Sequence, residues 1–92
     1  MKRQRLQVFY SGRVQGVGFR YTVKALAQGF DLAGVVRNLP DGRVELLVEG
    51  EPTELDAFRK AIQDSELGHF IRHEETTWTE AAYEFRGFEI VR

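Results

Sequence analysis

The first third of the chain changes from the periodicity of a strand to that of a helix. Leu6, Val8 and Tyr10 are apolar at every second position, which predicts a strand. The stretch GRVQGVGFR, from Gly12 to Arg20, then interrupts this alternation with three glycines. Beyond it, apolar residues recur at the spacing of one helix face, with Gly29 as the expected stop. These residues are Phe19, Val23, Leu26, Ala27 and Phe30.

Two β-rich runs with a turn between them follow the first helix. The runs extend from Gly34 to Leu39 and from Arg43 to Glu49. Pro40-Asp41-Gly42 lies between them and has the residue types that favour a tight turn. We therefore expect the two strands to form a hairpin.

A second helix and two further strands complete the pattern. Pro52 and Thr53 open the helix, and Thr53 with Asp56 resembles a capping box. The apolar face of this helix consists of Leu55, Phe58 and Ile62. A weak strand pattern runs from about Phe70 to Trp78, and a last strand is expected at Phe85, Phe88, Ile90 and Val91.

The resulting order, β-α-β-β-α-β with a C-terminal strand or extension, indicates the fold class. In a chain of 92 residues it favours a single α+β domain over residues 1–92. This is the ferredoxin-like, or split βαβ, sandwich, with an antiparallel sheet and two helices on one face. In this topology the first two strands run parallel with the third between them, so their C-terminal ends share one sheet edge. One of these ends carries GRVQGVGFR, and the other carries Asn38.

Composition excludes several classes of protein. The net charge is -1, from 13 basic and 14 acidic residues, so the chain lacks the basic field of a typical nucleic-acid binder. It contains no cysteine, which excludes thiol chemistry and cysteine-based zinc sites and fits a reducing compartment. The apolar run behind the basic N-terminus is too short for a signal peptide, and no window approaches a membrane span. We expect a cytoplasmic protein with neither a nucleic-acid nor a membrane partner.

The stretch GRVQGVGFR has the features of an anion site. Its glycines, Gly12, Gly16 and Gly18, permit positive φ and a close approach of a ligand to the backbone. A loop of inward N–H groups that runs into a helix N-terminus can hold an anion. Arg20 is unfavourable at a helix N-terminus unless an anion balances it, and its guanidinium fits phosphate oxygens. The residues alone also allow a simple turn with a solvated Arg20, and they match neither the P-loop nor the dinucleotide-binding fingerprint.

Two motifs resemble those of the acylphosphatase family. GRVQGVGFR is similar to the phosphate loop and arginine of that family, and GVVRNLPDGRVELLVEG, from Gly34 to Gly50, is similar to its second motif. The spacing from Arg20 to Asn38 and the ending GFEIV also match. The similarity is weak from Ile62 to Tyr83. Tyr10 replaces a preferred aliphatic residue and Val35 a preferred aromatic one.

The resemblance implies a small, stand-alone acylphosphatase of the bacterial and archaeal type. Such a hydrolase splits an acyl phosphate into a carboxylate and inorganic phosphate, without a metal or cofactor. The small-molecule acyl phosphate would be its partner, inorganic phosphate its product and inhibitor, and a monomer the expected state. Asn38 would orient the attacking water. Arg20 would bind the phosphoryl group together with the backbone N–H groups of Gln15, Gly16, Val17, Gly18 and Phe19.

Other interpretations remain open at this point. The same fold could serve as a non-catalytic sensor of phosphate or carbamoyl phosphate, because an acylphosphatase-like domain also occurs in hydrogenase-maturation proteins. RNA-recognition domains share the fold, but their aromatic residues lie on a central strand, which glycines interrupt here. We interpret His69 and His73 as a solvated pair rather than a metal site, Asp41 as a turn residue and Trp78 as packing on an edge strand.

Overall fold

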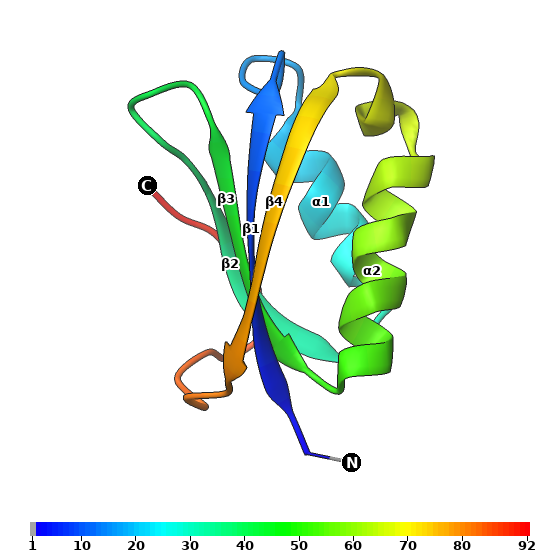
Figure 1. The fold of residues 1–92 in the computed structure, drawn as a ribbon, viewed down its shortest axis with the longest axis vertical. Helices are drawn as coiled ribbons and strands as arrows, with labels where there is room; N and C mark the ends of the chain where they lie inside the picture. Colours follow the sequence, from blue (N-terminus) through cyan, green and yellow to red (C-terminus); the bar gives the residue numbers. More distant parts are fainter. Residues whose placement is uncertain (1) are drawn as a thin grey trace.

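The computed structural model describes residues 2–92 and has the expected order of elements, with a short 3-10 helix added. Both α-helices cover the same face of one sheet (Figure 1). The helices are α1 (Phe19–Ala27), α2 (Pro52–Asp64) and the 3-10 helix η1 (Glu66–His69). The strands are β1 (Gln4–Gly12), β2 (Leu32–Asn38), β3 (Val44–Gly50), β4 (Ile71–Glu80) and β5 (Phe88–Ile90). No helix within residues 2–92 is long and apolar enough to cross a membrane.

The sheet has the strand order β4-β1-β3-β2-β5. Since β3 is antiparallel to both β1 and β2, these two strands are parallel and end at the same edge. This confirms the predicted ferredoxin-like fold. The short β5 pairs parallel with β2, so the sheet is mixed rather than wholly antiparallel. The Val91 N–H continues this edge by donating to the Val36 carbonyl at 3.0 Å.

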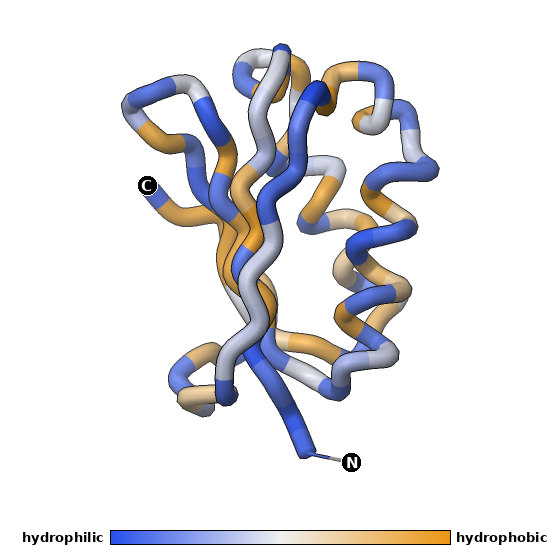
Figure 2. Tube along the Cα trace, viewed as in Figure 1, coloured by the Kyte–Doolittle hydropathy of each residue, from blue (hydrophilic) through white to orange (hydrophobic). Residues whose placement is uncertain are grey.

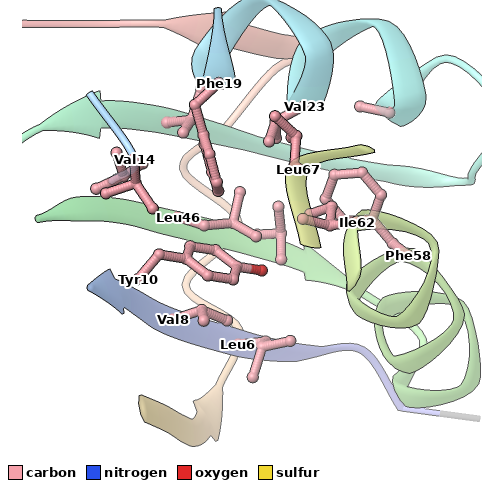
Figure 3. Close-up of a cluster of buried hydrophobic side chains, with 14 of the residues drawn as sticks. Leu6, Val8, Tyr10, Val14, Phe19, Val23, Leu46, Phe58, Ile62 and Leu67 are labelled. Atoms are coloured by element: carbon pink, nitrogen blue, oxygen red, sulfur yellow. The ribbon is translucent and has the colours of Figure 1, made fainter. Parts of the chain in front are cut away.

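The hydrophobic core lies between the sheet and the two helices (Figure 3). Leu6, Val8 and Tyr10 are fully buried, as their alternation predicts. The Tyr10 ring packs against the Phe19 ring of α1 at a centroid distance of 5.2 Å. Figure 2 shows that both the strands and the helices around this core contain apolar stretches. The helices contribute Phe19, Val23, Ala27, Leu55, Phe58 and Ile62.

Two predicted details at element ends are wrong, the capping box of α2 and the place of Phe85 in the last strand. The N-cap of α2 is Glu51, with no side-chain cap, so Thr53 and Asp56 do not form a capping box. Pro52 explains the shift, because its fixed φ and missing N–H suit the first position of a helix. Helix α1 ends at Ala27 with Gln28 as its C-cap, so Gly29 directly follows the cap, as expected of a stop residue. Phe85 precedes the last strand, and its ring lies 5.1 Å from the Arg5 guanidinium carbon.

A buried carboxylate fastens the segment after β4 to the sheet. Glu49 of β3 is only 3% exposed and accepts hydrogen bonds from Arg5 Nε at 2.9 Å and from the N–H groups of Ala82 and Tyr83 at 2.7 and 3.0 Å. Burial alone would raise the pKa of Glu49, but these donors hold it below its usual value. Arg5 also pairs with Glu84. The segment is thereby held against the Glu49 end of β3.

Candidate active site

The loop between β1 and α1 is anchored at both ends. Val14 and Phe19 turn fully buried side chains into the core. The Arg13 N–H donates to the Phe70 carbonyl at 2.9 Å, which ties the loop to the turn before β4. Gly12 has a φ of 128°, and a Cβ there would lie 2.4 Å from the same carbonyl oxygen. These anchors fix the loop while its backbone between them remains available to a ligand.

The backbone of this loop presents unsatisfied donors. Gly16 and Gly18 have φ values of 78° and 76°, as the sequence predicts. Gly18 is the N-cap of α1, where no side chain caps the helix and no acidic residue occurs in the first turn. Within residues 2–92, the N–H groups from Gln15 to Tyr21 have no hydrogen-bond acceptor. Such a row of N–H groups at a helix N-terminus has the chemistry that favours an anion.

Arg20 and Asn38 line one cavity of about 210 Å³ above this loop. The Arg20 guanidinium forms no ion pair in the described part of the chain. The Oδ1 atom of Asn38 is buried without a hydrogen-bond partner there. A buried polar atom of this kind normally has a partner, so Asn38 is ready to accept a hydrogen bond from a bound molecule. The full lining is Val14, Gly16, Gly18, Phe19, Arg20, Tyr21 and Asn38.

The predicted loop residues divide into two groups. Gly16, Gly18 and Phe19 line the cavity beside Arg20. Gln15 and Val17 do not, because the Gln15 side chain reaches the β2–β3 hairpin and Val17 packs against the core.

Sequence reasoning missed two residues of the lining, Val14 and Tyr21. Both lie within or directly beside the glycine-rich stretch, but nothing in their residue types indicates a binding site. Tyr21 lines the cavity although its side chain is 71% exposed.

The other singled-out residues lie outside the cavity. His69 belongs to η1 and His73 to β4, and residues 2–92 contain no group of three or more ligand-type side chains that could hold a metal ion. Asp41 accepts hydrogen bonds from the Arg43 N–H at 3.0 Å and from Arg43 Nε at 2.8 Å, which confirms its role in the turn. These two donors lower the pKa of Asp41. Trp78 is 40% exposed on the edge strand β4.

Fold and cavity together define a ferredoxin-like domain whose cavity combines free backbone N–H groups with an arginine and an asparagine. The family model described as "Acylphosphatase" matches residues 6–90, and the chain therefore belongs to the acylphosphatase family. This confirms the resemblance of the two motifs.

Curated relatives match over most of their length. The chain is 45% identical over 91 residues to "Acylphosphatase" of Acaryochloris marina, which covers 95% of this chain and 92% of the relative. It is 41% identical over 92 residues to "Acylphosphatase" of Thermococcus kodakarensis, with 99% of each covered.

Solved structures agree with this assignment. The acylphosphatase from Bacillus subtilis superimposes with a TM-score of 0.88 at 36% identity, covering 97% of this chain and 99% of the other. Full-length HypF in its phosphate- and nucleotide-bound form matches with a TM-score of 0.85 at 31% identity. That match covers 99% of this chain but 12% of HypF.

Proposed function

We propose that this member of the acylphosphatase family hydrolyses acyl phosphates to a carboxylate and inorganic phosphate at the cavity of Arg20 and Asn38. The observation that carries the proposal is the set of groups that surround this one cavity. It combines free backbone N–H groups, a cation without an ion pair and a buried amide oxygen without a partner. These are the groups needed to hold a phosphoryl anion and to orient a water molecule beside it.

Binding of the phosphoryl group uses the loop backbone and Arg20. The N–H groups from Gln15 to Phe19, which have no other acceptor, donate to the phosphate oxygens, and the positive end of α1 adds to their field. The planar guanidinium of Arg20 supplies two parallel N–H donors to phosphate oxygens. Because these donors are fixed by the anchored loop, they need little reorganisation as charge develops in the transition state.

The chemical step is attack of water on phosphorus. The Oδ1 atom of Asn38 accepts one hydrogen of the water and directs its lone pair at the phosphorus atom. The new P–O bond forms as the bond from phosphorus to the acyl oxygen breaks, and the carboxylate leaves with the bonding electron pair. The proton released by the water passes to a phosphate oxygen of the substrate. The transition state of such transfers is loose, so positioning and charge stabilisation supply most of the catalysis.

The cavity contains no carboxylate and no imidazole. Proton transfer to the substrate itself is sufficient here, because the leaving carboxylate has a conjugate acid with a pKa of only about 4 and needs no protonation. This separates acyl phosphates from phosphate esters of alcohols, whose alkoxide leaving groups require an acid. The residues of the cavity therefore favour the acyl-phosphate class.

The size of the cavity limits what it recognises. Its volume of about 210 Å³ is below the roughly 300–1,000 Å³ of pockets that enclose larger ligands. The phosphoryl head fits inside, and the acyl group extends outward past the exposed Tyr21. We therefore propose that small and aromatic acyl phosphates are all accepted, by a protein that acts as a cytoplasmic monomer.

Hydrolysis of benzoyl phosphate, followed by its ultraviolet absorbance in the presence of EDTA, tests the proposal. The purified chain should turn the substrate over in the chelator. Arg20→Ala should lose turnover, whereas Arg86→Ala, which removes an exposed arginine outside the cavity, should retain it. Absence of turnover in the unsubstituted chain, or equal loss in both variants, would refute it.

The second candidate function is a phosphate or carbamoyl-phosphate sensor without turnover. The match to a small part of HypF is the observation in its favour. Inorganic phosphate would then protect the chain against thermal unfolding although benzoyl phosphate remained intact.

A further inference from the structure

The side chain of Gln15 connects the β1–α1 loop, which carries the free N–H groups, to the β2–β3 hairpin, which follows Asn38. Its Nε2 atom donates to the Leu39 carbonyl at 2.9 Å and to the Arg43 carbonyl at 2.9 Å. Both acceptors belong to the β2–β3 hairpin, and the Leu39 N–H also donates to the Arg43 carbonyl at 2.8 Å. One side chain of the phosphate loop therefore closes the base of the hairpin with both of its amide hydrogens.

The two carbonyls that accept hydrogen bonds from Gln15 lie next to Asn38. Leu39 directly follows Asn38, and Asn38 is opposite Val44, which directly follows Arg43. The amide of Gln15 thus holds both arms of the hairpin directly next to the Asn38–Val44 pair, on the turn side of that pair. In Figure 1 the loop after β1 and this hairpin lie at the same end of the sheet. The bridge spans the separation between the anion-binding backbone and the asparagine.

We propose that Gln15 is a positioning residue, which fixes the Asn38 amide relative to the phosphate loop. The inference rests on the proposed function in so far as Asn38 orients the water. A primary amide is required, because its two N–H groups serve two carbonyls at once. Glutamate would place a carboxylate against carbonyl oxygens, and methionine would fill the space without donating.

A double-mutant cycle of Gln15→Met and Asn38→Ala tests the inference. A displacement of about 1 Å at a reacting group can cost up to about 100-fold in rate, so we expect Gln15→Met to lower kcat by roughly 10- to 100-fold. The inhibition constant of inorganic phosphate should change by less than about threefold, since the loop backbone is retained. In the Asn38→Ala background, Gln15→Met should have little further effect on kcat, because the group that it positions is gone.

The matched control is Gln7→Met, which removes another glutamine donor, the 2.7 Å hydrogen bond from Nε2 to Glu45, at a distance from the cavity along β1. This variant should keep kcat unchanged. An equal loss of kcat in the wild-type and Asn38→Ala backgrounds would overturn the inference, and so would a loss of phosphate affinity as large as the loss of kcat.

A second variant, Gln15→Glu, gives an independent readout and covers the possibility that Gln15→Met does not fold. Its carboxylate should depress kcat at neutral pH, and protonation at acid pH should restore one donor and part of the rate relative to wild type. A ratio of rates that is constant with pH would contradict the inference.

One measurement does not depend on turnover. In amide NMR spectra, Gln15→Met should shift the Asn38 side-chain resonances and leave the Gly16 and Gly18 amides near their wild-type positions. If the unsubstituted chain fails to hydrolyse benzoyl phosphate but this shift is present, the proposed function fails and the bridge stands. If the chain is active and the Asn38 resonances do not move, the bridge fails and the function stands.

Discussion

Replacing Glu49 by glutamine should destabilise the protein in a pH-dependent manner. The change removes the negative charge that faces Arg5 and turns one acceptor oxygen into a donor opposite the Ala82 and Tyr83 N–H groups. Loss of one partner from a buried ion pair costs about 3–5 kcal/mol. The Arg5 side chain is 19% exposed, so we expect the lower end, about 3 kcal/mol. Typical domains unfold at a cost of only 5–15 kcal/mol, and the loss is therefore easily measured.

The pH dependence follows from the lowered pKa of Glu49. A carboxyl group with a depressed pKa in the folded state stabilises the protein above its unfolded pKa, near 4.3. That contribution is lost as the pH falls through the folded pKa. The free energies of unfolding of wild type and Glu49→Gln should therefore differ by the full amount at pH 7 and approach each other as the pH falls.

Urea unfolding at pH 7 and at several values below pH 4 measures this difference. Glu84→Gln is the matched control, because Glu84 pairs with the same Arg5 but is 57% exposed, and its loss should cost less than about 1 kcal/mol. The reasoning is refuted if the two variants are equally destabilised, or if the gap between Glu49→Gln and wild type stays constant down to the lowest pH.

Three further substitutions have defined outcomes. Arg20→Lys should lower kcat/KM for benzoyl phosphate by about 100-fold or more, because a point charge lacks the two parallel donors; recovery of near-normal activity would show that charge alone suffices. Gly12→Ala should lose at least about 2 kcal/mol in urea unfolding, because its Cβ would meet the Phe70 carbonyl, while Gly42→Ala, with a φ of 96° and open space around it, should lose clearly less. Tyr10→Phe should be neutral or stabilising by up to about 1 kcal/mol, since the buried hydroxyl has no partner in the described chain; a marked loss of stability would mean that this hydroxyl is hydrogen-bonded.

Periodicity and turn chemistry were sufficient to predict most of the architecture. The alternation up to Tyr10 and the helical spacing from Phe19 both reflect burial on one face, which is the strongest signal in a sequence. Since the topology makes β1 and β2 parallel, the sequence also predicts that Arg20 and Asn38 lie at one edge of the sheet. The cavity that they share confirms this placement.

The features that were missed depend on contacts between distant segments. The predicted start of α2 at Pro52 is right, but the predicted capping box is wrong, because Thr53 and Asp56 match the capping pattern although Glu51 is the N-cap. The parallel pairing of β5 and the burial of Glu49 arise only when the C-terminal segment returns across the sheet. The bridge from Gln15 ends on backbone carbonyls, which every residue type carries, so no residue in the hairpin reveals it.

The division of roles between Arg20 and Asn38 is tested most directly by Asn38→Ala. Steady-state hydrolysis of benzoyl phosphate and competitive inhibition by inorganic phosphate should be measured on the same preparation. We expect kcat to fall by about 100-fold or more, while the inhibition constant of phosphate stays within about threefold of wild type. An equal loss of phosphate affinity and of kcat would contradict the account, because Asn38 would then hold the anion rather than the water.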